Sequence, residues 1–332
     1  QKGQMLQRES TLQSLKDAGF NMLLLANNHI TDYGECGLRQ TITSIDQYGF
    51  DRMGAGFEYN DVYRPHVLNI AGLKIGIINL CEAQLGQFKE KDQSHGYAWL
   101  GDYELDERIR TLRKEVDYLI VIPHAGLESY SVPLKQFRHL YQHWCDLGVD
   151  VVVGGHPHIS QGIEQYGNSI IFYSLGNFFF TGFNGEIDTW TKGISCVLHF
   201  SEKGISYDVI QHRMNDECVS TVHTDINDIE AKNYILANDE SYKKALKEQN
   251  AIAFEALPMR LYMSALNGTS SCDSLVTKIK KIIFYLINRK SLYAGTEKYR
   301  MSVLKRLTEN ETYRYLTISA IEDQLGENDQ RL

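Results

Sequence analysis

The sequence lacks paired cysteines and long apolar runs. No C-x-x-C pair occurs among its six cysteines, which excludes a zinc ribbon or a thiol redox motif of the usual spacing. Some cysteines, such as Cys81 and Cys196, lie in apolar stretches, so we expect buried free thiols in a reducing compartment. No apolar run reaches the roughly 18 residues that a transmembrane helix requires, and the chain does not open with a signal-peptide segment.

Clusters of positive charge are also missing. The formal net charge is −8, which argues against a nucleic-acid-binding protein because phosphate binding needs clustered Lys and Arg. Small anionic substrates are not excluded, since bound metal ions would change the local field. What is present is an ordinary globular composition, with 43% hydrophobic and 23% charged residues in a chain of 332.

Strand and helix signals alternate through the first two thirds of the chain, which predicts an α/β fold. Apolar residues at helical spacing predict helices at 7–18, 35–48, 103–116 and 134–147. Continuous apolar runs predict buried strands at 20–26, 118–122 and 149–153. Hairpins are predicted at 67–80, 162–173 and 193–212. Beyond residue 215 strand signals vanish, so we expect one domain over residues 1–215 and an α-helical extension over residues 216–332.

Histidines follow all three predicted buried strands. The strands run into Asn27-Asn28-His29, into His124, and into Gly154-Gly155-His156-Pro157-His158. A lone His is usually a structural residue. In α/β sheets, however, ligand-binding residues collect beyond the carboxyl ends of the strands. Three such ends that all carry His therefore predict a metal site.

The G-G-H-P-H run is the most specific part of this pattern. Residues two apart in an extended segment point the same way, so we expect His156 and His158 to face one site. Gly154 and Gly155 let the backbone turn tightly after the strand. Imidazoles suit Zn, Mn, Fe or Ni, and an amide oxygen suits the harder ions of that series.

The stretch 25–37, LANNHITDYGECG, resembles the A-N-N-H-x-x-D-Y-G-x-x-G motif of CapA-type capsule and poly-γ-glutamate biosynthesis proteins. Other elements of that family recur in order: Gly54-Ala55-Gly56, His124-Ala125-Gly126 with Glu128, G-H-P-H, and the segment 173–178, YSLGNF. The resemblance covers roughly residues 10–200. It implies a fold similar to calcineurin-like metallophosphoesterases, a β-sandwich flanked by helices.

The resemblance also implies roles for individual residues. Asn28, His124 and His156 resemble ligands of one divalent ion, and His158 resembles a ligand of a second. His29 resembles the group that faces the substrate and protonates the leaving oxygen. Candidate substrate contacts are Asn27, Glu128 and Asn177. We expect one or two ions of Mn, Zn, Fe or Mg.

The sequence departs from the family in one respect. The family begins with G-D and N-L-E motifs that supply acidic ligands, and neither is present here. Without them the ion at His158 lacks most of its protein ligands. Either these motifs lie outside this chain or this member holds one ion or none. We favour the first explanation, because the chain opens abruptly inside a predicted helix.

Several further residues have two interpretations. Asp32 either orients His29 or caps the helix that follows. The segment 278–290, KIKKIIFYLINRK, could lie on a membrane surface, but a helix packed on the domain is the commoner arrangement. The remaining histidines lack a comparable context and are predicted to be structural or exposed: His66, His95, His139, His143, His199, His212 and His223.

The sequence thus predicts a metal-dependent enzyme of capsule or poly-γ-glutamate-type surface-polymer biosynthesis, with phosphoester hydrolysis as the reaction. Its substrate would be an anionic small molecule or polymer, and other polymer-biosynthesis proteins are candidate partners. One alternative is a non-catalytic assembly partner of a polymer ligase complex. Another is a metal-dependent isomerase or epimerase with His29 as base. The resemblance places the protein in a bacterium, in the cytoplasm or associated with a membrane.

Overall fold

The computed structural model describes residues 4–180, 188–202, 204–215, 217–222, 226–256 and 294–325. It divides into two compact units, Gln1–Lys243 and Lys244–Leu332. All residues of the predicted site lie in the first unit. His223 and the segment 278–290, for which predictions were made above, lie outside the described residues, as does Cys272, one of the six cysteines.

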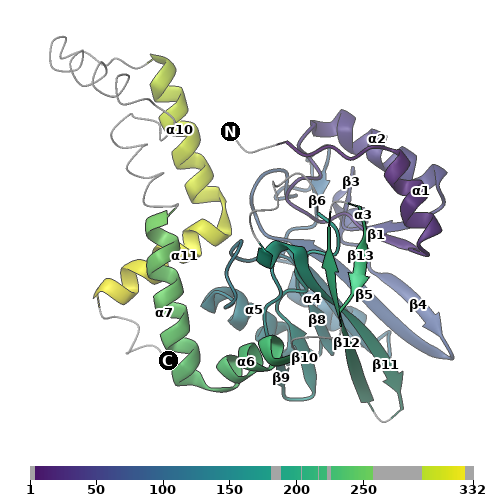
Figure 1. Ribbon diagram of the computed structural model, residues 1–332. Helices are drawn as coiled ribbons and strands as arrows, with labels where there is room; N and C mark the ends of the chain where they lie inside the picture. Colours follow the sequence, from purple (N-terminus) through teal and green to yellow (C-terminus); the bar gives the residue numbers. More distant parts are fainter. Residues whose placement is uncertain are drawn as a thin grey trace. The chain divides into compact units, whose positions relative to one another are not determined.

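A six-stranded sheet in the order β4-β5-β7-β8-β10-β9 forms the centre of the first unit (Figure 1). Its strands are β4 (His66–Ile70), β5 (Leu73–Cys81), β7 (Tyr118–His124), β8 (Val151–Val153), β9 (Ile163–Tyr166) and β10 (Ser169–Phe172). Strands β5, β7, β8 and β10 are parallel, and β4 and β9 are antiparallel edges. The predicted strands at 118–122 and 149–153 and the hairpins at 67–80 and 162–173 are confirmed.

A second sheet packs on this one. It consists of β11 (Lys192–Ser201), β12 (Gly204–Met214) and β13 (Val219–Thr221). Alternate side chains of β11 and β12, such as Leu198 and Val209, join the core formed by Ile120 and Phe172 of the six-stranded sheet. The hairpin predicted at 193–212 is confirmed, and β13 adds a strand beyond residue 215.

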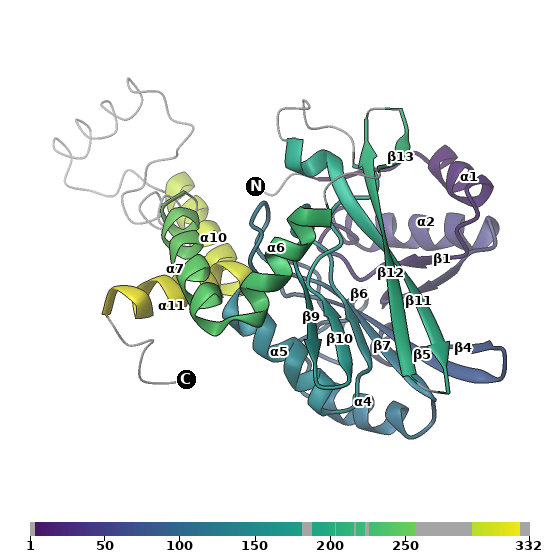
Figure 2. The same cartoon turned by 60° about the horizontal axis from the view of Figure 1, so that its bottom comes forward.

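Helices α4 (Leu105–Arg113) and α5 (Lys135–Asp146) pack against β7, β8 and β10. Figure 2 shows β11 and β12 along one side of the six-stranded sheet and these helices on the other. The sheet is covered on both faces, which explains why its parallel strands are nearly continuous apolar runs. The predicted β-sandwich flanked by helices is confirmed.

The segment that carries Asn28 follows a strand of a separate small sheet. Strand β1 (Met22–Leu24) pairs in parallel with β2 (Asp51–Met53), and α2 (Gly34–Gln47) packs nearby. The strand predicted at 20–26 is present, but the prediction that it is buried along its length is wrong. The strand has three residues, and Leu24 is 38% exposed because it lies on the face that is turned away from α2.

The other elements are short or lie near the ends of the chain. They are α1 (Ser10–Asp17), α3 (Tyr59–Val62), β3 (Ala55–Gly56), β6 (Gly96–Tyr97), the 3-10 helix η1 (Asp188–Thr191), α6 (Ile226–Ala237), α7 (Asp239–Ala256), α10 (Ala294–Glu309) and α11 (Glu311–Leu325). Among the described residues no helix is long and apolar enough to cross a membrane. Cys81 and Cys145 are buried thiols as predicted, Cys196 is only partly buried, and Cys36 and Cys218 are exposed.

Candidate metal centre

Parallel pairing brings the polar strand ends together. Cys81 at the end of β5 pairs with His124 at the end of β7, and His124 is bridged to Gly155 after β8. The loop after β1 joins this edge through Asn79, a buried residue of β5. The Asn79 side chain accepts a hydrogen bond from the Ala26 amide and donates one to the Ile122 carbonyl, both at 2.9 Å. The predicted convergence of these strand ends is therefore present in the fold.

Three of the predicted ligands face one another. Asn28 Oδ1 lies 3.2 Å from His124 Nε2, and that nitrogen lies 3.1 Å from His156 Nδ1. Ligands of a tetrahedral ion with bonds of about 2.0–2.1 Å are about 3.3–3.4 Å apart. Asn28 and His156 are also buried, at 3% and 7% exposure. The two distances therefore fit a divalent ion held by these three side chains.

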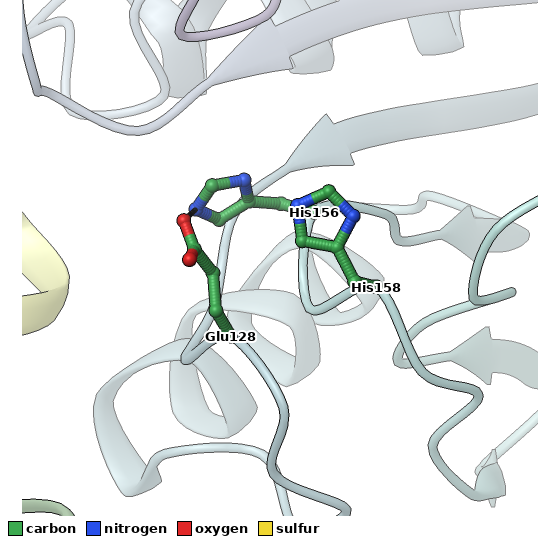
Figure 3. A group of neighbouring side chains, drawn as sticks. All are labelled: Glu128, His156 and His158. Carbon is green, nitrogen blue, oxygen red and sulfur yellow. Dashed lines mark ion pairs between the residues drawn. The ribbon is translucent and has the colours of Figure 1, made fainter. Parts of the chain in front are cut away.

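A second group lies on the other side of His156. One possible ligand atom from each of Glu128, His156 and His158 lies within 4.8 Å of the others. Glu128 Oε1 is 3.7 Å from His156 Nε2, and Figure 3 shows this carboxylate beside the ring. A neutral imidazole has one acceptor nitrogen, so a His156 that binds through Nδ1 carries its proton on Nε2. That nitrogen lies 3.7 Å from Glu128 Oε1, 3.7 Å from Glu82 Oε1 and 3.3 Å from Gln84 Nε2. Glu128 and His158 then remain as ligands for a second ion.

The backbone of the G-H-P-H segment differs from the prediction. His156 and His158 have φ values of +100° and +65°, in the left-handed region that residues other than glycine rarely adopt. The segment is therefore not extended and the premise of the prediction is wrong, although His156 and His158 still lie together at one group of possible ligands. Such conformations cost roughly 1–3 kcal/mol each. The Gly155 and Pro157 carbonyls hold the segment by accepting hydrogen bonds from Ala125 and Ser129 amides.

The His158 ring is fixed by its neighbours. It stacks on Trp190, and its Nδ1 lies 2.9 Å from Asn177 Oδ1. The Asn177 amide donates to the Trp190 carbonyl at 3.0 Å, which fixes Oδ1 as the atom that faces His158. Since an amide oxygen only accepts, His158 carries its proton on Nδ1 and presents the Nε2 lone pair. Asn177, predicted as a substrate contact, is buried and contacts a candidate ligand.

Asp32 holds the His29 ring. Of the two roles considered for this carboxylate, orienting His29 or capping the following helix, this is the first. His29 Nδ1 lies 2.7 Å from Asp32 Oδ2, which also accepts from the Met5 amide at 2.9 Å. The His29 side chain is 27% exposed and that of Asp32 only 8%. Asn27 Oδ1 accepts from the His29 amide at 3.0 Å, so this predicted substrate contact also shapes the turn. The arrangement leaves His29 Nε2 as the nitrogen available to a substrate.

Sequence reasoning missed two residues next to these ligands. Glu82 is fully buried, with Oε1 3.7 Å from His156 Nε2. Gln84 lies between Glu82 and Asn28 and is hydrogen-bonded to both. The signal available in the sequence was an acidic residue directly after the apolar run that ends at Cys81.

The remaining described histidines are structural or exposed, as predicted. His143 and His199 form exposed pairs with Asp106 and Asp208, each at 2.8 Å. Burial lowers the pKa of His212 below its ordinary value. It also lowers the pKa of His139, with a smaller effect from Lys135.

Comparison with known proteins yields one family and several relatives. The family described as Bacterial capsule synthesis protein PGA_cap matches residues 4–182. The capsule biosynthesis protein CapA of Bacillus anthracis is 34% identical over 177 residues, which are 52% of this chain and 43% of the relative. The PGA biosynthesis protein CapA of Bacillus subtilis (strain 168) is 31% identical over 173 residues, 52% of this chain and 46% of the relative. The chain thus spans about half the length of these relatives.

Solved structures show weaker likeness. Thermus thermophilus SoxB, titled a sulfate thiohydrolase, matches with a TM-score of 0.43 and 11% identity, covering 76% of this chain and 40% of that one. A 5'-nucleotidase precursor from Thermus thermophilus matches with a TM-score of 0.40 and 14% identity, covering 76% of this chain and 46% of that one.

Proposed function

Because the chain belongs to the bacterial capsule synthesis protein PGA_cap family, we propose that it is a metal-dependent enzyme of surface-polymer biosynthesis. The names of the two CapA relatives support capsule or poly-γ-glutamate as the polymer. The observation that carries the proposal is that His124 Nε2 lies 3.2 Å from Asn28 Oδ1 and 3.1 Å from His156 Nδ1. Two nitrogens and one oxygen at this spacing are a donor set for a divalent ion.

The proposed ligands divide into two groups. Asn28, His124 and His156 hold one ion, and His158 holds a second with Glu128, which replaces our earlier assignment of Glu128 to the substrate. A divalent ion bound here supplies positive charge that offsets the negative charge developing on the substrate. The substrate is accordingly an anionic small molecule or polymer. Phosphoester hydrolysis is the proposed reaction.

His29 and Asp32 are the proposed proton-transfer pair. Asp32 holds Nδ1 of His29 at 2.7 Å, which fixes the orientation of the ring and favours a proton on that nitrogen. In hydrolysis a water oxygen would form a bond to phosphorus as the ester P–O bond breaks, and His29 in its charged form would donate its Nε2 proton to the leaving oxygen. In this proposal Asn28 binds the ion, and the neighbouring His29 donates a proton to the substrate.

The test measures metal and turnover on the same protein. The purified chain is reloaded with Mn, Zn, Fe or Mg, its metal content is determined, and hydrolysis of p-nitrophenyl phosphate and its bis-ester is followed. We expect bound metal and metal-dependent hydrolysis, with both lost in His156→Ala. A chain that binds no metal would support the assembly-partner alternative. Stoichiometric metal without phosphoester hydrolysis would refute the proposed reaction and favour the isomerase alternative.

A further inference from the structure

Glu82 is a charged group placed inside the core beside the proposed ligands. It follows β5 directly and is 0% exposed. Its Oε2 accepts a hydrogen bond from the Gly126 amide at 3.3 Å, and its Oε1 accepts one from Gln84 Nε2 at 2.7 Å. Burial of a carboxylate costs free energy unless it is well paired or serves a metal. The explanation for a buried carboxylate beside these ligands should therefore lie in its hydrogen-bond partners.

The contacts of Gln84 supply this explanation. Its Nε2 donates to Glu82, and its Oε1 accepts a hydrogen bond from Asn28 Nδ2 at 3.0 Å. An ionised carboxylate only accepts hydrogen bonds, so Glu82 must face the NH₂ group of Gln84. The carbonyl of Gln84 is then turned toward Asn28, and it in turn must face the NH₂ group of Asn28. These constraints leave Asn28 Oδ1 facing His124.

The orientation of the Asn28 amide decides whether that residue is a ligand. Its oxygen has lone pairs for a metal ion, whereas its NH₂ group only donates. An amide side chain that turns over would place hydrogens against the ion. Glu82 thus fixes the orientation of the Gln84 amide, and the Gln84 amide fixes that of Asn28. Glu82 need not contact the ion to have this effect.

We propose that Glu82 is a positioning residue of the metal centre, acting through the Gln84 amide to keep the Asn28 oxygen directed at the ion. The proposal rests on the proposed metal binding and goes beyond it by assigning roles to two residues. Partners of this kind, one step removed from the metal, typically change its affinity by about 10–100-fold. Low dielectric around the buried carboxylate strengthens the effect.

The experiment compares metal affinities of the full chain, measured by titration of Mn²⁺ and Zn²⁺ against a fluorescent chelator. We expect Glu82→Gln and Gln84→Leu each to weaken binding by about 10–100-fold. The double variant should bind metal no more weakly than the single variant with the larger loss of affinity, because both substitutions break the same series of hydrogen bonds. Glu164→Gln is the matched control. Glu164 is also nearly buried, but it is paired with Arg138, so its loss should affect stability and leave metal affinity unchanged.

Asn28→Asp provides a readout that a merely structural role of Glu82 would not affect. An aspartate presents an oxygen whichever way it turns, so in this background Glu82→Gln should lose its effect on affinity. Unchanged metal affinity in Glu82→Gln would overturn the proposal. So would a loss of metal affinity in Glu82→Gln that is not accompanied by a loss in Gln84→Leu. If Glu82→Gln does not fold, the half-buried Gln84 tests the same contacts by itself. His124→Ala distinguishes failure of the positioning role from failure of the metal centre. If His124→Ala also leaves metal affinity unchanged, the proposed metal centre itself is wrong.

Discussion

His158 and Trp190 are stacked, with ring centroids 4.3 Å apart and planes inclined by 19°. The Trp190 carbonyl also orients Asn177, which holds Nδ1 of the same imidazole. We therefore expect Trp190→Ala to release the His158 ring and to weaken binding of the second ion by about 10-fold or more. Both variants keep the backbone carbonyl that orients Asn177, but Trp190→Phe also keeps an aromatic face and should lose less. Isothermal titration that resolves two binding events measures this. Equal loss of both ions in Trp190→Ala would contradict the division into two groups.

The adjacent pair Asn28 and His29 should separate metal binding from chemistry. We expect His29→Ala to retain its metal and to lose turnover by about 10²–10⁴-fold, the usual contribution of a general acid. His156→Ala should instead lose metal, because a nitrogen ligand is removed. Metal content and phosphoester hydrolysis are measured on both variants. If His29→Ala lost as much metal as His156→Ala, the role given to His29 would be wrong. Unchanged turnover in His29→Ala would argue against His29 as the general acid of hydrolysis.

Asn79 connects the small sheet to the six-stranded sheet through two hydrogen bonds. Asn79→Ala leaves the Ala26 amide and the Ile122 carbonyl without these bonds, and each buried unsatisfied group costs about 1–3 kcal/mol. We therefore expect the free energy of unfolding in urea to fall by several kcal/mol, and metal affinity to fall with it because Asn28 follows Ala26 closely. Asn69→Ala, on the exposed part of edge strand β4, is a control with little expected effect. Wild-type stability in Asn79→Ala would refute this connection.

Burial of His212 should make the fold sensitive to acid. The lowered pKa of His212 means that the unfolded chain takes up a proton near pH 6.5, the ordinary value, while the folded chain does so only at lower pH. Its stabilising contribution is therefore complete above about pH 6.5 and is lost as the pH falls through the folded-state pKa. In His212→Gln the free energy of unfolding should decline less between pH 7.5 and 5.5 than in wild type. A slope in His212→Gln equal to that of wild type would contradict the prediction.

Local sequence pattern was sufficient for the main architecture. Apolar runs at 118–122 and 149–153 identified β7 and β8, because strands covered on both faces need apolar residues on both. The turns at Ala71-Gly72 and Gly167-Asn168 located two hairpins, since backbone conformation in short turns depends mainly on the residues within them. Strand ends that carry His124 and His156 could be expected to meet, because parallel strands share one carboxyl edge.

The details of the site depended on contacts between distant segments. Glu82 lies beside the ligands because β5 pairs with β7 so that Cys81 lies opposite His124, and a strand's own residues do not encode the identity of its neighbour. The left-handed conformations of His156 and His158 are held by amides of the loop after β7. The sequence by itself therefore determined which strands form and which residue types end them. Tertiary structure alone decided the backbone of the G-H-P-H segment and the place of Glu82 and Gln84, because both follow from hydrogen bonds between residues far apart in the chain.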